Sequence, residues 1–512
     1  MQKIITAGAL GLSTAFGSDV YLPPVPEGDY ILTPAPGEEP AIHGPDRFGV
    51  RPGSPFQYTI PATGKRPMEF SVRGLPAGLK LDGATGIITG TIADKAERTY
   101  PVTLEANNAL GKSEKAFEIV QGRTICLTPP LGWNSWNCWT DRVDETKVLA
   151  TAEAMVRKGL INYGWTYVNI DDTWQGLRDG GQNPIQPNKK FPDMKGLCDA
   201  IHAMGLKVGI YSTPWITSYA NHCGGSSNDR NGAWSKEIPD GRSHGKFKFD
   251  SHDVAQWVAW GMDYLKYDWR PNDEESTRRM ADALEAGGRD IVYSLSNAAP
   301  LALGPQLADE VNAYRTTGDI RDAWTTGLGD PSDLVGVRDI WDFHERWADF
   351  TRPGHFPDPD MLVVGKVGWD GTPQPTQLTP DEQYTHISLW CLWSAPLLIG
   401  CPVEDMDAFT LGLLTNAEVL AVNQDSLCAM GRTSGEGSAR LVTKPLKDGS
   451  LAVGLFNVDD KPQEVRADWA TLGVSGKKRV RDLWRQKDIG EFDGRFAAMV
   501  PAHGGVLVRI SD

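Results

Sequence analysis

The stretch from residue 167 to residue 212 decides the fold, because it holds a strand, a helix and a second strand in succession. It begins with YVNIDD at 167–172, continues with DMKGLCDAIHAMG at 193–205 and ends with KVGIYS at 207–212. The first and last runs have the length of buried strands, and the middle run has helical apolar spacing with Asp193 placed to cap it. Two strands joined by a helical crossover predict a parallel pair.

The same alternation extends on both sides, from Cys126 to about residue 427. Asp144 can cap another helix, with Gly159 placed to end it. The strand candidates are 131–133, 167–172, 207–212, 264–269, 291–296, 312–317, 360–364 and 396–400. Eight strands separated by helices are what a closed (β/α)8 TIM barrel requires, so we expect a barrel over residues 123–427.

Two β-rich regions flank the expected barrel. Residues 48–122 alternate over short runs separated by turn signals, and the string LPAGLKLDGATGIITGTI at 75–92 resembles immunoglobulin-like modules that accompany bacterial catalytic domains. We therefore expect an Ig-like β-sandwich there, a spacer or a carbohydrate binder. Residues 428–512 alternate in the same way and predict a C-terminal antiparallel β-sandwich. Residues 1–47 are expected to hold a possible signal peptide and a linker.

Composition excludes several classes of protein. The chain has 512 residues, enough for two or three domains, and a formal net charge of −15, which argues against nucleic acid as a partner. No apolar run is long enough to span a bilayer, so we expect no integral membrane segment. The sequence gives no indication of the oligomeric state.

The N-terminus and the cysteines bear on the cellular location of the protein. Lys3 precedes the mostly apolar run 4–12, and small residues follow at 15–17, which predicts an export signal and a secreted or periplasmic protein; a frayed start is the alternative. The seven cysteines form no CxxC pair, so neither a zinc site nor a dense disulfide framework is indicated. We expect most of them to be buried thiols.

Acidic residues recur at the ends of the predicted strands. They are Asp171 and Asp172 after the second strand, Asp268 after the fourth, Asp319 just beyond the sixth, and Asp358 and Asp360 at the seventh. A lone strand-end acid is commonly a turn or cap residue. However, the carboxyl ends of barrel strands meet at one rim, and acids gathered there repel one another unless a ligand or a cation shares the site.

A sugar and a metal ion are the two ligands that such a rim suits. Metal is the less favoured, because no His stands beside these acids and no calcium loop is visible, so we predict no metal and no cofactor. Sugar hydroxyls both donate and accept hydrogen bonds, and Lys266 and Arg315 supply local positive charge. The 18 Trp residues offer flat platforms for a pyranose, although many must serve the core.

At these residues the chain resembles glycoside hydrolase family 27, which contains alpha-galactosidases and alpha-N-acetylgalactosaminidases. The resemblance runs from Leu127 to about Asp425. The strings that carry it are LTPPLGWNSWN from Leu127, YVNIDDTWQG from Tyr167, GLKVGIYS from Gly205, YLKYDW from Tyr264, YRTTGDIRDAW from Tyr314 and DPDMLVVG from Asp358. Six strings in the family's order imply a retaining glycoside hydrolase that acts on galactose-containing oligo- or polysaccharides.

The resemblance implies roles for ten residues. Asp268 is the nucleophile, and Asp319 is the general acid and base. Asp322 is the alternative candidate for the acid, but we expect it to be a residue that begins a helix. The other eight bind the substrate: Asp171 and Asp172 the 4- and 6-hydroxyls, Lys266 the ring hydroxyls, Trp133 and Tyr211 the sugar face, Ser296 and Arg315 the 2-position, and Asp360 the far wall. Packing at the barrel mouth is the alternative for Trp133 and Tyr211.

Two other readings stay open. The string SLSNAA at 294–299 has small residues where galactosidases of the family present bulkier ones near the 2-hydroxyl, so an alpha-N-acetylgalactosaminidase is the first alternative. A barrel that binds carbohydrate without cleaving it is the second. Both candidate catalytic carboxylates are present, which disfavours the second alternative.

Overall fold

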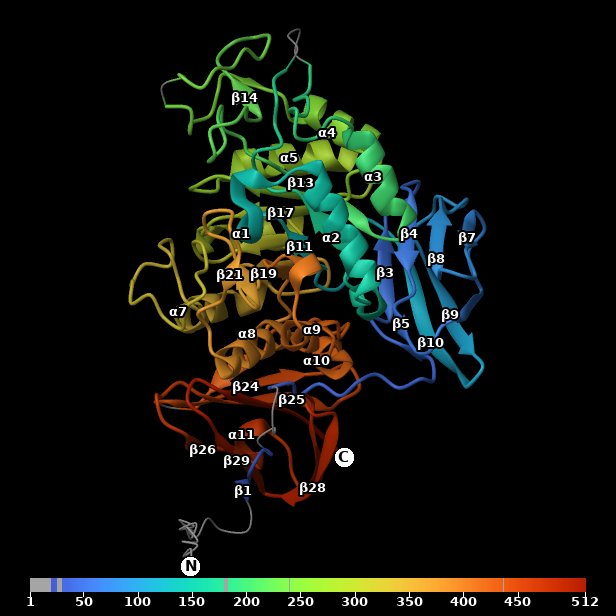
Figure 1. Cartoon of the computed structure of the whole chain (residues 1–512), viewed down its shortest axis with the longest axis vertical. Coiled ribbons are helices and arrows are strands. Elements are labelled where there is room, and N and C mark those ends of the chain that lie inside the picture. Colours follow the sequence, from blue (N-terminus) through green and yellow to red (C-terminus); the bar gives the residue numbers. More distant parts are fainter. Residues whose placement is uncertain (1–19, 25–29, 179–182, 239, 436) are drawn as a thin grey trace, which may run out of the picture.

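The computed structural model describes residues 20–24, 30–178, 183–238, 240–435 and 437–512 (Figure 1). They form an N-terminal β-sandwich, a central α/β barrel and a C-terminal β-domain. The run 4–12, expected as an export signal, lies outside the described residues. Among the helices that the structure describes, none has the length and apolarity needed to cross a membrane.

Eight parallel strands confirm the predicted barrel, and they lie in the order β19-β18-β17-β16-β13-β12-β11-β22. Their bounds are β11 Leu131–Asn134, β12 Tyr167–Asn169, β13 Lys207–Ser212, β16 Tyr264–Asp268, β17 Val292–Ser296, β18 Ala313–Arg315, β19 Phe356–Asp358 and β22 Leu397–Ile399. Leu362, just beyond β19, forms a parallel bridge with Ile399 and so closes the sheet.

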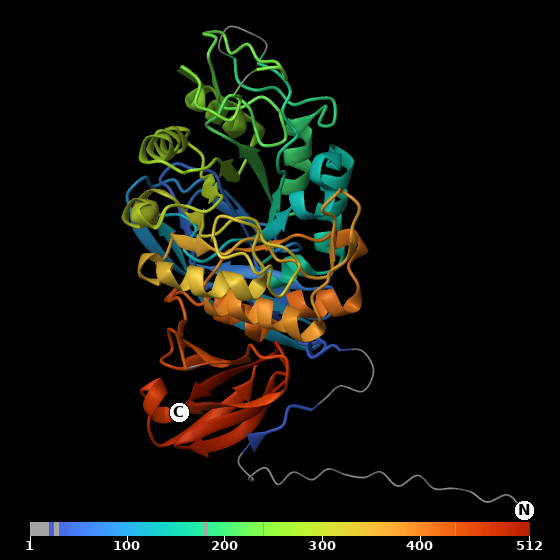
Figure 2. The ribbon, with the colours of Figure 1, turned by 90° about the vertical axis from the view of Figure 1, so that its left-hand side faces the viewer.

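Helices connect the barrel strands and cover them (Figures 1 and 2). They are α1 Trp136–Trp139, α2 Glu145–Arg157, α3 Met194–Ala203, α4 Asp250–Trp260, α5 Glu274–Ala286, α6 Gly304–Glu310, α7 Val337–His344, α8 Pro380–Leu392, α9 Ala408–Leu414 and α10 Ala417–Asn423. The predicted caps are confirmed: Asp144 accepts a hydrogen bond from the Lys147 amide, and Asp193 accepts one from the Gly196 amide. These caps satisfy amides that a helix start leaves free.

The seventh barrel strand corrects the sequence prediction. It is Phe356–Asp358 and not 360–364, so Asp358 rather than Asp360 belongs to the strand. Asp360 has φ 86°, in the left-handed region, where a strand cannot continue. The apolar run that follows, Met361 to Val364, is buried and makes one sheet bridge, at Leu362, but forms no continuous strand.

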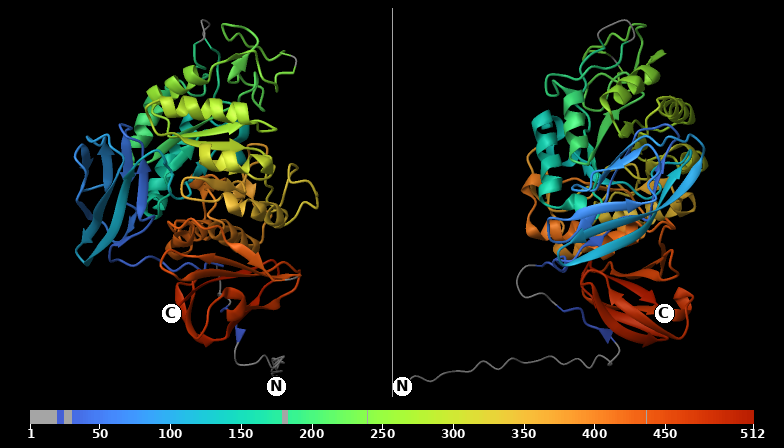
Figure 3. Two further views of the ribbon diagram at one scale, coloured as in Figure 1. Left: turned by 180° about the vertical axis from the view of Figure 1, so that it is seen from behind. Right: turned by 90° about the vertical axis from the view of Figure 1, so that its right-hand side faces the viewer.

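The N-terminal sandwich has two main sheets, ordered β3-β10-β9-β6 and β4-β8-β7, and confirms the expected Ig-like module. The strands are β2 Ala41–Ile42, β3 Arg47–Val50, β4 Phe56–Thr59, β5 Ala62–Thr63, β6 Glu69–Arg73, β7 Leu79–Leu81, β8 Ile87–Gly90, β9 Arg98–Asn108 and β10 Gly111–Gln121. Its Gln57 donates to the Leu206 carbonyl and its Thr59 to the Gly205 carbonyl. The module therefore contacts the barrel where β13 begins, at the end opposite the strand-end acids (Figure 3).

The C-terminal domain packs a sheet ordered β23-β24-β25-β30-β27-β28 against one ordered β1-β29-β26. The bounds are β1 Val20–Tyr21, β23 Arg432–Ser434, β24 Ala439–Pro445, β25 Leu451–Asn457, β26 Gln463–Asp468, α11 Trp469–Leu472, β27 Lys477–Asp482, β28 Lys487–Asp493, β29 Arg495–Val500 and β30 Gly505–Ser511. Strand β1 precedes the N-terminal sandwich in the sequence, yet it pairs in parallel with β29 of the C-terminal domain. Tyr30, a few residues further on, donates a hydrogen bond to Asp381 in helix α8 of the barrel. Described parts of the segment expected as a linker thus contact both the C-terminal domain and the barrel.

Candidate active site

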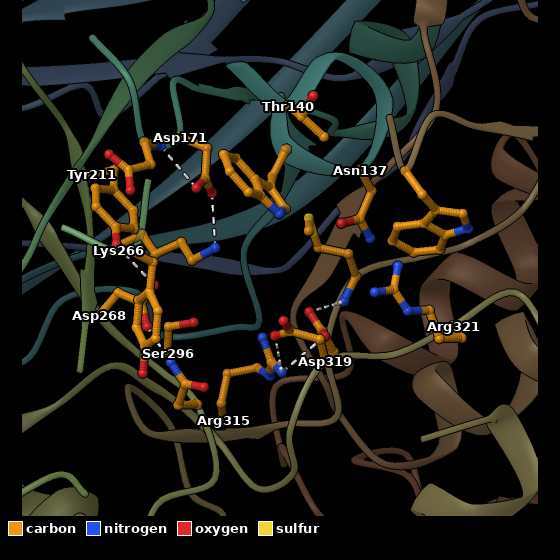
Figure 4. A pocket seen from close by; sticks show the side chains of 17 residues that line it. Asn137, Thr140, Asp171, Tyr211, Lys266, Asp268, Ser296, Arg315, Asp319 and Arg321 are labelled. Carbon is orange, nitrogen blue, oxygen red and sulfur yellow. Dashed lines mark hydrogen bonds and ion pairs between the residues drawn. The ribbon is translucent and has the colours of Figure 1, made fainter. Parts of the chain in front are cut away.

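A cavity of about 320 Å³ lies at the carboxyl ends of the barrel strands (Figure 4). Asp268, Ser296 and Arg315 are the last residues of their strands, and all three line it. The other predicted site residues that line it are Asp171, Asp172, Tyr211, Lys266, Asp319 and Asp360. Nine of the ten predicted residues are therefore brought together, as expected for one rim of a parallel barrel.

Trp133 is the exception, and its predicted place on the sugar face is corrected. Its indole is fully buried and donates to the Cys401 carbonyl over 3.0 Å. It does not line the cavity because β11 continues one residue further and α1 then brings Trp136 to the wall. An aromatic wall is present, but a different tryptophan supplies it.

Asp268 is held at both carboxylate oxygens. The Tyr211 hydroxyl donates to Oδ2 over 2.9 Å, and the Asn297 side-chain amide donates to Oδ1. Burial raises the pKa of Asp268 to about 7, although Lys266 and the Tyr211 hydrogen bond oppose the rise. Asp319 and Asp171 add to it by charge repulsion. The carboxylate is fixed in orientation, and a proton can occupy it near neutral pH.

The surroundings of Asp319 shift its pKa in the opposite direction from that of Asp268. Its side chain is 60 % exposed to solvent in the cavity, and one oxygen lies 3.2 Å from Nη2 of Arg315. The enclosing walls favour the neutral acid, but Arg315 and Lys266 outweigh them and the pKa of Asp319 is lowered. The two carboxyls thus share one cavity, in which the pKa of Asp268 is raised and that of Asp319 is lowered.

Arg315 is clamped by the neighbouring strand end. It forms a 2.9 Å ion pair with Asp360 and donates to the carbonyls of Thr317 and Gly318, so the loop that carries Asp319 is tied to the rim. Asp360 also accepts from the Ile320 amide over 2.9 Å. Because Arg315 and Asp360 are buried and bound to each other and to this loop, they fix the position from which Asp319 enters the cavity.

The other wall carries the tandem carboxylates. Asp171 accepts from Lys266 over 2.8 Å, and Asp172 accepts from the Ala220 amide over 2.9 Å. Both side chains are almost fully buried, and burial raises the pKa of Asp172. Figure 4 shows Asp171 and Lys266 across the cavity from Arg321. This wall offers acceptors and one ammonium group to a polar ligand.

Eight residues that line the cavity were not predicted as site residues: Trp136, Asn137, Thr140, Tyr219, Asn297, Arg321, Met361 and Trp369. Asn297 directly follows the predicted Ser296, so the rule that strand ends form the site could have included it. The other seven lie further beyond the strand ends, where the path of each loop decides which side chains reach the cavity. Asp322 does not begin a helix: it accepts from the Trp369 indole over 2.8 Å and from the Gln377 amide over 2.9 Å.

A closed parallel barrel with two carboxyls in one sugar-sized cavity, flanked by fixed acceptors and an aromatic wall, defines a glycoside hydrolase. Residues 128–425 match the family model described as "Alpha galactosidase A", residues 436–510 match "Alpha galactosidase C-terminal beta sandwich domain", and residues 39–121 match "Putative Ig domain". The chain belongs to glycoside hydrolase family 27 and is of the alpha-galactosidase type.

Relatives of known sequence and structure agree with this placement. Alpha-galactosidase 2 of Arabidopsis thaliana is 36% identical over 388 residues, which are 74% of this chain and 88% of the relative. Alpha-galactosidase A of Cellvibrio japonicus is 33% identical over 406 residues, covering 76% and 93% of the two chains. The crystal structure of a "putative alpha-galactosidase" from Bacteroides fragilis superposes with a TM-score of 0.84 at 32% identity and covers 93% of this chain and 98% of its own.

Proposed function

We propose that the cavity releases terminal alpha-linked galactose by a double displacement in which Asp268 is the nucleophile and Asp319 the general acid and base. Asp268 attacks the anomeric carbon while Asp319 gives a proton to the leaving oxygen, and a glycosyl ester forms on Asp268. Asp319 then takes a proton from water, which attacks the same carbon and frees Asp268. Two inversions leave the anomeric configuration retained.

The observation that carries this proposal is the shared cavity of Asp268 and Asp319. A nucleophile must keep its orientation, and Tyr211 and Asn297 supply that from two sides of the carboxylate. An acid and base must reach both the leaving oxygen and water, and Asp319 is the more exposed of the two carboxyls. Fixed orientation therefore suits Asp268 to attack the sugar, and exposure suits Asp319 to exchange protons with the leaving oxygen and with water.

Galactose is favoured over other hexoses by the Asp171 and Asp172 wall. An axial 4-hydroxyl points away from the plane of the ring and needs an acceptor of its own. Two adjacent carboxylates, one of them bound to Lys266, can receive the 4- and 6-hydroxyls together. The proposed substrates are galactose-terminated oligo- or polysaccharides.

Azide rescue tests the two roles separately. Asp268→Ala opens space beneath the sugar, so azide should attack an aryl alpha-galactoside directly and give the beta-galactosyl azide. Asp319→Ala keeps the nucleophile, so azide should intercept the glycosyl ester and give the alpha-galactosyl azide. The same anomer from both variants, or near-normal activity of Asp268→Ala without azide, would refute the assignment.

An alpha-N-acetylgalactosaminidase is the second candidate, favoured by the small residues after β17. Ser296 lines the cavity and Ala299 is buried beside it, where a bulkier pair would restrict the 2-position. The ratio of kcat/KM for nitrophenyl alpha-galactoside and its N-acetylgalactosaminide decides between them. Ser296→Glu should reduce turnover of the N-acetyl substrate more than that of the galactoside.

We also propose that the protein is exported, on the basis of Lys3 and the apolar run that follows it. The seven cysteines, all described, are free thiols and neither support nor oppose export. Cell fractionation combined with N-terminal sequencing of the mature protein tests this proposal. A mature chain that still begins at Met1 in the cytosolic fraction would contradict it.

A further inference from the structure

Three cationic side chains line the cavity, and one of them is not used by the proposed chemistry. Lys266 is paired with Asp171, and Arg315 is paired with Asp319 and Asp360. Arg321 also lines the cavity, yet its guanidinium forms no ion pair with any carboxylate in the part of the chain that the structure describes. Its five N–H donors are therefore available to a ligand.

Arg321 is nevertheless held in place. Its guanidinium carbon lies 4.2 Å from the centroid of the Trp369 ring, a distance typical of a cation–π contact. Trp369 follows β20 (Lys366–Val367) in the hairpin that β21 (Gln374–Pro375) completes. Its indole is anchored by the 2.8 Å hydrogen bond to Asp322. A preorganised guanidinium loses less entropy when a ligand arrives than a freely moving one does.

Arg321 lies on the side of the cavity where the leaving group is expected, and not beside Asp171 and Lys266, which are proposed to bind galactose. It follows Asp319 by two residues, and Figure 4 shows both on the same side of the cavity, across from Asp171 and Lys266. In the proposed reaction Asp319 meets the leaving oxygen, whereas the Asp171 wall meets the galactose hydroxyls. A group attached beyond the scissile oxygen would therefore come to Arg321 and Trp369.

We infer that Arg321 and Trp369 form a leaving-group subsite for an acidic sugar, one that carries a carboxylate or a sulfate ester. The inference rests on the proposed function, because Asp319 as general acid defines the leaving-group side. Guanidinium groups bind carboxylates and tetrahedral oxyanions through two parallel hydrogen bonds, and Trp369 adds an apolar aromatic surface to the cavity wall.

The charges of the cavity confine an acidic occupant to the neighbourhood of Arg321. The protein carries a net charge of −15 and the cavity is lined by five aspartates, so an anionic substrate would be repelled unless a local cation received it. Arg321 also lowers the pKa of Asp319. An anion bound to Arg321 would offset this effect and favour the protonated Asp319 that donates to the leaving oxygen.

Two open-chain substrates test the inference: galactosyl-alpha-1,6-gluconate (melibionate) and galactosyl-alpha-1,6-glucitol (melibiitol). In both, the leaving oxygen is a primary 6-hydroxyl, and the leaving groups differ only at C1, which is a carboxylate in the first and a neutral hydroxymethyl group in the second. Wild-type enzyme should show the higher kcat/KM with melibionate, and added salt should reduce that preference. Arg321→Gln should lower kcat/KM for melibionate about tenfold more than for melibiitol, as expected for a charge-assisted hydrogen bond. Arg321→Lys should keep part of the preference.

Arg142→Gln is the matched control, since Arg142 is an exposed arginine that does not line the cavity and donates to Thr372 in the same hairpin turn. It should leave the ratio of the two kcat/KM values unchanged. Equal rates for both substrates in wild type, or equal losses for both in Arg321→Gln, would overturn the inference while leaving the proposed function intact. Failure to hydrolyse melibiitol and nitrophenyl alpha-galactoside alike would instead refute the proposed function.

Discussion

Tyr211 on β13 donates its hydroxyl hydrogen to Oδ2 of Asp268 on the neighbouring strand β16, over 2.9 Å. A hydrogen bond to a carboxylate favours its charged form, so this contact lowers the pKa of Asp268.

Tyr211→Phe removes that bond and should move the acidic limb of the kcat/KM profile to higher pH. At pH 6 the loss should be about tenfold, because the nucleophile is then less often ionised and less firmly oriented. Profiles for wild type and variant with nitrophenyl alpha-galactoside check this. An unshifted acidic limb would show that the hydroxyl does not act on Asp268.

Asp319→Asn should shift the same limb in the opposite direction. The charge of Asp319 raises the pKa of Asp268, so a neutral amide should lower that pKa and extend residual activity to lower pH. A dinitrophenyl galactoside makes the measurement possible, because its leaving group needs little help from an acid. Asp322→Asn is the control, since Asp322 lies on the same loop but does not line the cavity, and it should leave the limb in place.

Asp268→Asn should stabilise the fold at alkaline pH. Burial raises the pKa of Asp268 from 3.8 to about 7, so between these values the folded protein holds a proton that the unfolded chain has released. The contribution of Asp268 to stability therefore declines as the pH rises through this window. The amide does not ionise, so the gain in unfolding free energy should approach the order of 3 kcal/mol at pH 8 and vanish near pH 4. Thermal unfolding at both pH values checks this, and a gain that is independent of pH would contradict it.

A buried ion pair joins the loop between β12 and α3 to α4, and we predict that its loss destabilises the fold. Arg178 contacts both oxygens of Asp253, at 2.7 and 2.6 Å, and both side chains are almost completely buried. Arg178→Met would leave Asp253 without its cation and should cost about 3–5 kcal/mol. The exposed pair of Lys195 and Asp199 is the control, where Lys195→Met should cost less than about 1 kcal/mol. Similar melting temperatures for the two variants would argue against the buried pair.

The barrel could be predicted because strand length, helix spacing and caps agreed with one another over residues 123–427. Asp144 and Asp193 lie at helix starts where their local sequence put them. The seventh strand was missed because the apolar run Met361 to Val364 owes its character mainly to burial, with a single sheet bridge at Leu362, and not to continuous sheet pairing. Composition cannot separate these two causes, whereas the positive φ of Asp360 does.

The site was predictable to the extent that it lies on strand ends. Asp268, Ser296 and Arg315 end their strands, so the rule for parallel barrels brought them together. Trp133 was placed wrongly because a strand gives no sign of where it stops to within one or two residues. Arg321 and Trp369 were missed because two separate loops bring them together, and loop paths follow from tertiary contacts that a single sequence does not reveal.

The pairing of β1 with β29 has a consequence for biosynthesis. Val20 and Tyr21 are made more than 470 residues before their partners Ala497 and Ala498. During translation β1 has no native neighbour, so it must wait or be shielded until the final strands emerge. The sheet β1-β29-β26 can therefore be completed only after β29 has been made, and a nascent chain stalled before β29 would leave the edges of β1 and β26 unpaired.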